Sequence, residues 1–84
     1  MRAEQIINLI EVGGTGRARA YLKRLALVER LPLIHDCFPY INSRKRVDFF
    51  QEHFAAEIVA LVDTKFDYVV AEKRYRELLR SGKN

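Results

Sequence analysis

The stretch that decides the fold runs from Ser43 to Asp63 and reads SRKRVDFFQEHFAAEIVALVD. Its apolar residues recur at intervals of three and four, which is the spacing of one face of an α-helix. A second apolar row beside the first makes the apolar arc wider than that of an ordinary surface helix. We therefore predict a long helix that is either central to the fold or covered on its second side by a partner. The first row is Val47, Phe50, Phe54, Ile58 and Leu61, and the second is Phe49, Ala56, Val59 and Val62.

The same periodicity predicts two helices on the N-terminal side of this stretch. The first is expected from Ala3 to Val12, and Gly13 and Gly14 end it because glycine readily adopts the left-handed conformation of a helix C-terminus. The second is expected from Gly16 to Arg30, with Thr15 as its N-cap. The inner stripes are Ala3, Ile6, Ile7 and Ile10 in the first helix, and Ala18, Tyr21, Leu22, Leu25 and Val28 in the second.

A further helix is predicted after Asp63. Thr64 is its expected N-cap, Asp67 lies at the capping-box position, and Glu72 and Arg76 form an i, i+4 pair in the favourable order. Residues 81–84 are expected to be a frayed tail. The inner stripe of this helix is Tyr68, Ala71, Tyr75 and Leu78.

The segment from Leu31 to Asn42 is the least regular part of the chain. Pro32 disfavours helical geometry at the residue before it, so it predicts the end of the second helix. Pro32 also fits the first position of a helix, which leaves open a short extra helix between Pro32 and Cys37. We expect the segment to cover the other helices as a lid. The predicted fold is all-α, a compact bundle of four main helices, with residues 1–84 forming a single helical domain.

Length and composition limit the classes of protein that this chain can be. Its 84 residues are too few for a two-domain enzyme or a doubly wound nucleotide-binding fold. A single cysteine excludes a disulfide framework and a zinc site built on several thiolates. The first residues contain no apolar run of signal-peptide length, and no apolar run approaches the length of a membrane span. A cytoplasmic location is therefore expected.

No catalytic or metal-binding motif is complete. The loop from Gly13 to Arg17 lacks the Lys-Ser/Thr pair of a phosphate-binding loop and follows a helix rather than a strand. His35, Asp36, Cys37 and His53 are too few and too scattered for a zinc site or an oriented Cys–His pair. A helix-turn-helix around Gly13 or Gly14 would turn charged residues inward. We therefore predict no catalytic residue, no metal and no cofactor, and the chain is not expected to be an enzyme.

Two basic clusters remain as the candidate binding site. Each is expected in the first turn of a helix, where the helix dipole favours acidic residues, so their presence suggests that they bind an anion. The alternative is that these side chains are simply solvated. The net charge of +4 favours an anionic partner. The candidate residues are Arg17, Arg19, Ser43, Arg44, Lys45 and Arg46.

Two functions fit these features. The first is binding of nucleic acid or a nucleoprotein complex through phosphate-directed, sequence-tolerant contacts. The second is that of an adaptor or inhibitor that docks on an acidic surface of a partner protein. The second apolar row of the long helix needs a cover, either the segment from Leu31 to Asn42 or a second copy of the chain. We favour a homodimer, whose interface residues would be Phe49, Val59 and Val62. Reversing the charge of residues 44–46 is expected to remove binding without lowering stability.

Overall fold

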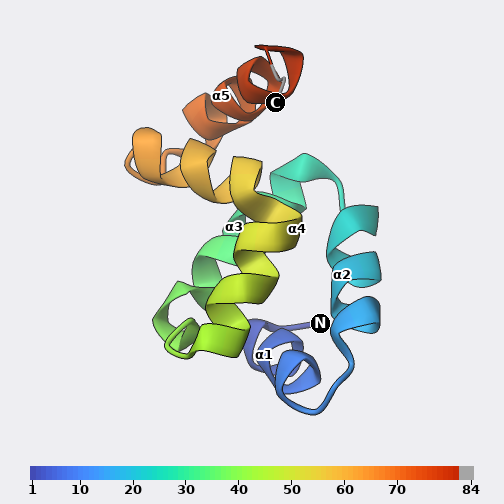
Figure 1. Cartoon of the computed structure of the whole chain (residues 1–84). Helices are drawn as coiled ribbons and strands as arrows, with labels where there is room; N and C mark the ends of the chain where they lie inside the picture. The colour runs from blue at the N-terminus through green and yellow to red at the C-terminus, as the bar shows by residue number, and fades with distance from the viewer. Residues whose placement is uncertain (82–84) are drawn as a thin grey trace.

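The computed structural model describes residues 1–81, and in that part of the chain every regular element is helical. The prediction of an all-α fold is therefore confirmed. α5 forms one end of the molecule, α1 forms the other, and α2 runs along one side (Figure 1). The elements are α1 (Ala3–Glu11), α2 (Thr15–Arg24), α3 (Leu27–Cys37), the 3₁₀ helix η1 (Phe38–Tyr40), α4 (Arg44–Asp63) and α5 (Tyr68–Ser81).

The core is one cluster of buried side chains, supplied mainly by α1, α3 and α4. The inner stripe predicted for the first helix is confirmed, since all four of its residues are buried. The inner stripe of α5 packs against the same cluster, although only Ala71 is fully buried. The largest completely buried side chains are Phe50, Phe54, Ile6, Ile10, Leu22, Leu31, Ile34 and Leu61.

The turn between α1 and α2 uses glycine as expected. Gly13 has a φ of +91°, which L side chains rarely adopt, and the N–H of Gly14 donates to the carbonyl of Leu9 at 2.6 Å. This pair of features is the glycine-ended C-terminus of an α-helix. A Cβ on Gly14 would lie 2.8 Å from Leu9 Cδ2, so the Leu9 side chain would have to move to accept a larger residue there. Thr15 is not the N-cap, however, because the cap is Gly14 and Thr15 is the first residue of α2.

The predicted helix from Gly16 to Arg30 is wrong, because the chain is extended at Leu25 and Ala26, with ψ values of 143° and 150°. α3 begins at Leu27 and continues through Pro32, so the proline does not end a helix. Proline removes a single backbone donor, whose acceptor would be the carbonyl of Val28, and Val28 lies exposed at the surface instead of facing inward.

The segment from Leu31 to Asn42 is therefore no lid. Most of it belongs to α3, and this helix packs against α1, α4 and α5. Leu31, Ile34 and Cys37 are all completely buried. The short helix left open between Pro32 and Cys37 is the second half of this longer, central helix.

Arg30 explains why α2 ends where it does. Its Nε donates to the carbonyl of Leu22 at 3.0 Å and its Nη2 donates to the carbonyl of Leu25 at 3.1 Å, so one guanidinium caps the end of α2. Its Nη1 lies 2.8 Å from Glu57 Oε2 on α4. Both side chains are largely buried, and Glu57 is the only buried charged residue between Met1 and Ser81. This ion pair ties α2, α3 and α4 together.

α4 is kinked at Phe54, whose φ of −137° and ψ of 31° are not helical. Steps of three residues fall short of one helical turn, so the row drifts around α4 from Phe49 towards Val62, and the kink lies between its two ends. Phe49 lies before it and is buried inside the chain, whereas Val59 and Val62 lie after it and are 41% and 53% exposed. The second apolar row predicted from the sequence is therefore not one surface. Whether a second copy covers Val59 and Val62 stays a prediction.

The turn between α4 and α5 also differs from the expectation. Thr64 ends α4 and does not cap α5; its hydroxyl donates to the carbonyl of Ala60 at 2.7 Å. Asp67 is the cap, because its Oδ1 accepts hydrogen bonds from the N–H groups of Val69 and Val70 at 3.1 and 3.3 Å. Of the expected frayed tail, Ser81 is the last residue of α5, and residues 82–84 lie outside the described part of the chain.

Candidate anion-binding surface

The basic residues at the start of α4 have partners inside the molecule. Arg46 Nε lies 2.8 Å from Glu11 Oε1, and its Nη1 donates to the carbonyl of Tyr40 at 2.8 Å and to Asn42 Oδ1 at 3.1 Å. Its side chain is only 19% exposed. Lys45 Nζ donates to the carbonyl of Glu11 at 3.2 Å. These two side chains hold α4 against the C-terminus of α1.

The other two residues of this cluster are used differently. The hydroxyl oxygen of Ser43 accepts the N–H of Arg46 at 3.4 Å, which makes Ser43 the N-cap of α4. Arg44 is 89% exposed and lies 3.6 Å from Asp48, a surface pair of little strength. Arg44 therefore lies largely in solvent, whereas Ser43, Lys45 and Arg46 are hydrogen-bonded within the molecule.

The basic residues of α2 are in the opposite situation. Arg17 and Arg19 are exposed, and the same helix adds two exposed basic residues that sequence reasoning missed, Lys23 and Arg24. Within residues 1–81 no salt bridge involves Arg17, Arg19 or Arg24. A signal for this surface was present in the sequence, since no acidic residue occurs between Glu11 and Glu29.

All of the chain's formal net charge resides in α2. The chain has 15 basic and 11 acidic residues, and α2 contains four of the basic residues and none of the acidic ones. The remaining residues therefore hold eleven of each sign. Five of the arginines outside α2 are paired with carboxylates, at Arg30, Arg44, Arg46, Arg74 and Arg76.

Helix geometry arranges the bases of α2 along both edges of its exposed face. The buried side chains Ala18 and Leu22 define its inner side, which packs against α1. Arg17 and Arg24, two turns apart, lie along one edge of the outer side, and Arg19 and Lys23 lie along the other. The centre of the outer side carries Gly16 and Ala20. Because glycine has no side chain and alanine only a methyl group, little projects from the helix between the two edges.

Lys23 is the one basic residue of α2 whose charged group contacts another of the described helices. Its Nζ donates to the carbonyl of His53 at 3.0 Å and lies 4.8 Å from the centre of the Phe54 ring. These contacts satisfy a backbone carbonyl beside the kink of α4. Lys23 therefore links α2 to α4, while the three arginines of α2 face solvent.

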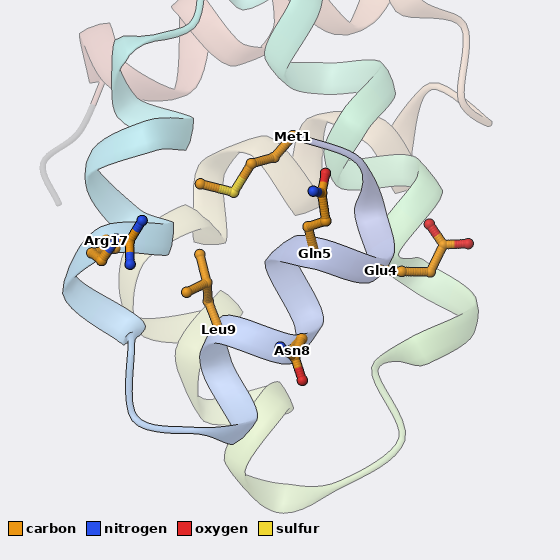
Figure 2. A pocket seen from close by; sticks show the side chains of 6 residues that line it. All are labelled: Met1, Glu4, Gln5, Asn8, Leu9 and Arg17. Atoms are coloured by element: carbon orange, nitrogen blue, oxygen red, sulfur yellow. The ribbon is translucent and has the colours of Figure 1, made fainter.

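A pocket lies between α1 and α2, beneath one edge of the basic face (Figure 2). Its volume is about 500 Å³. Arg17 reaches it from α2, and Gln5, Asn8 and Leu9 line it from α1, with Met1 beside them. Glu4 also lines it. The pocket joins one guanidinium to two amide side chains, and both groups hydrogen-bond readily to phosphates and to polar parts of nucleotides.

The residues considered for catalysis have structural surroundings. Burial, with smaller contributions from Asp36 and Glu4, raises the pKa of Cys37 to about 12, so this thiol is protonated at neutral pH. His35 Nδ1 lies 2.7 Å from Tyr68 Oη, and its ring stacks on Phe66 at 4.3 Å. Among the described residues no three His, Cys, Asp or Glu side chains are grouped so that they could hold a metal ion. None of their helices is long and apolar enough to cross a membrane.

Comparison with known proteins gives no guide, because no family model, curated protein or solved structure matches this chain. A function must therefore be inferred from the charge and shape of the surface itself.

Proposed function

We propose that this protein binds nucleic acid through its phosphates, and that the exposed face of α2 makes the contacts. The observation that carries the proposal is that the entire net charge of +4 lies on this one helix, with three arginines that have no carboxylate partner within residues 1–81. Arginine is the side chain best suited to phosphate, because its planar fork donates two parallel hydrogen bonds.

The composition of this face favours nucleic acid over an acidic protein surface. Interfaces between proteins are centred on large apolar or aromatic anchors. The exposed large apolar residues of the chain all lie outside Thr15–Arg24, and the centre of the face is Gly16 and Ala20. Contact with a phosphate backbone requires no such anchor, since release of counterions supplies most of the free energy of binding.

The same composition predicts binding that tolerates any sequence. Base edges are read by side chains that reach into a groove and offer paired donors and acceptors. Gly16 and Ala20 offer neither donors nor acceptors. The arginines and the lysine lie at the edges of the helix, where the phosphates of a bound strand would be. We therefore expect a dissociation constant in the range of non-specific binding, about 10⁻⁴–10⁻⁶ M at moderate salt.

The test is fluorescence anisotropy of labelled duplex DNA, single-stranded DNA and duplex RNA of unrelated sequences. The variant Arg17→Gln, Arg19→Gln, Arg24→Gln should weaken binding to all of them at least tenfold. A matched control removes three charges elsewhere, at Arg44, Lys73 and Arg80, which are exposed as well. It should weaken binding much less.

Two results would refute the proposal. One is absence of binding by the wild-type protein at 50 mM salt up to about 10⁻⁴ M, the weak limit for non-specific binders. The other is an equal loss in the two triple variants, which would mean that total charge, and not α2, determines binding. Binding of an acidic protein in the absence of any nucleic-acid binding would favour the adaptor function.

A further inference from the structure

A second, smaller pocket adjoins the first and is built almost entirely from α2. Its volume is about 220 Å³, and it is lined by Met1, Arg17, Ala20, Tyr21 and Arg24. The four residues from α2 are spaced i, i+3, i+4 and i+7, so they lie on one side of the helix, from the edge with Arg17 and Arg24 to Ala20 at the centre. Met1 and Arg17 line both pockets, which places the smaller pocket beside the one in Figure 2.

Every polar side chain that lines this pocket can donate a hydrogen bond, and no acidic residue lines it. Arg17 and Arg24 have no salt-bridge partner within residues 1–81. Tyr21 Oη accepts a hydrogen bond from the amino nitrogen of Met1 at 2.5 Å, so the hydroxyl hydrogen of Tyr21 remains to be donated. Ala20 leaves open the space between the two guanidinium groups.

We infer that this pocket binds one phosphate ester, held by Arg17 and Arg24 from either side and by the hydroxyl of Tyr21. Two guanidinium forks and a hydroxyl supply donors to a tetrahedral anion and leave no acceptor that would suit a cation. The volume exceeds that of a bare phosphate group, so it leaves room for the first atoms of the attached alcohol. The inference rests on the proposed function where the ester is a phosphate of bound nucleic acid; a small phosphorylated molecule offers the same chemistry.

The test separates the shape of the pocket from its charge. Ala20→Leu fills the space between the arginines without changing any charge, and leucine is nearly as favourable as alanine in a helix. Ala55→Leu is the matched control, because Ala55 is an exposed alanine on α4. Arg24→Gln removes one of the two guanidinium groups. Circular dichroism checks that each variant is folded.

Binding is followed by NMR, through the Nε resonances of Arg17 and Arg24, during titration with inorganic phosphate, glycerol 3-phosphate and a short single-stranded DNA. We expect saturable shifts with inorganic phosphate, with a dissociation constant on the order of 1 mM, as a few charge-assisted hydrogen bonds provide. Ala20→Leu and Arg24→Gln should weaken this binding at least tenfold, and Ala55→Leu should leave it unchanged.

The outcomes keep the two proposals apart. If Ala20→Leu binds phosphate as the wild type does, the pocket is not the site and the inference fails, whatever happens with DNA. If phosphate and glycerol 3-phosphate bind but DNA does not, the inference is supported with a small phosphate ester as the ligand, and the proposed function fails. If Ala20→Leu weakens DNA and phosphate together, the pocket holds a phosphate of the nucleic acid.

Discussion

The first turn of α4, with three basic residues, and the exposed face of α2, with four, are both strongly basic in sequence and quite different in the folded molecule. Arg46 and Lys45 are bound to the carboxylate and the carbonyl of Glu11, and they join two helices. Arg17, Arg19 and Arg24 have no carboxylate partner in the described part of the chain. The difference shows that the fold gives one basic cluster intramolecular partners and leaves the arginines of the other in solvent, where a partner could reach them.

The comparison changes what charge reversal of residues 44–46 should do. From sequence alone, Glu at these positions is expected to leave stability unchanged, because acidic residues suit a helix N-terminus. In the structure Arg46→Glu would place two carboxylates together where Arg46 and Glu11 now lie 2.8 Å apart. The reversed protein should therefore be less stable, and loss of binding by it would not identify a site.

The same distinction between partnered and unpartnered residues applies to the apolar row of α4, where the largest effect is expected. Phe49→Glu should abolish folding, because Phe49 is buried and an unpaired carboxylate in its place costs several kcal/mol or more. Val59→Glu should leave the protein folded, since Val59 is 41% exposed. Circular dichroism and urea unfolding measure both.

Sedimentation of the Val59→Glu protein then tests the predicted homodimer. If wild-type protein sediments as a dimer and the variant as a folded monomer, the exposed end of the row is the interface. A wild-type monomer at high micromolar concentration would exclude the dimer. Unfolding of the Val59→Glu protein would contradict the burial described for α4.

Removing the buried partner of an arginine should have the next largest effect. Glu57→Ala leaves Arg30 largely buried without its carboxylate and should lower the free energy of unfolding by about 3 kcal/mol. Arg30→Met with Glu57→Met should recover part of this loss, because no unpaired charge remains. Urea unfolding measures the free energy of unfolding of both variants. If Glu57→Ala is as stable as wild type, the ion pair does not hold α2, α3 and α4 together.

A smaller effect on the free energy of unfolding is expected from substitution of Arg46. Comparing it with the same substitution in α2 tests the two basic regions directly. Arg46→Gln removes an ion pair and a bond to the carbonyl of Tyr40, and we expect a loss of about 1 kcal/mol in the free energy of unfolding. Arg17→Gln and Arg24→Gln should change it by less than about 0.5 kcal/mol, as substitutions of solvated side chains usually do. Equal losses at Arg46 and Arg17 would contradict the distinction drawn between the two regions.

Much of the fold was readable from the sequence because helical periodicity depends on local spacing. The helix class, the buried stripe of α1, the glycine turn at Gly13 and the start of α4 at Ser43 all follow from residues close together in the chain. The break at Leu25 did not, because Arg30 and Glu57 enforce it from other helices. The kink at Phe54 was missed for a similar reason, since Lys23 of α2 binds the carbonyl beside it.

The candidate site was half predictable. Arg17 and Arg19 were found because a helix N-terminus is an unusual place for arginine. Lys23 and Arg24 were missed because the predicted helix ran on to Arg30, which placed them in its interior, away from the N-terminal turn that singled out Arg17 and Arg19. The roles of Arg46 and Lys45 could not be foreseen, because their partner Glu11 is more than 30 residues away in the chain.

The most direct test of the central claim is the salt dependence of DNA binding, measured as the slope of log affinity against log salt concentration. Each phosphate contact by a base contributes a slope of about −0.9 on duplex DNA. If the arginines of α2 make the contacts, removing Arg17, Arg19 and Arg24 should reduce the steepness of the slope by about 3, and removing Arg44, Lys73 and Arg80 should leave it almost unchanged. A slope that falls equally in both variants, or only in the second, would contradict the claim that the unpartnered face of α2 is the binding surface.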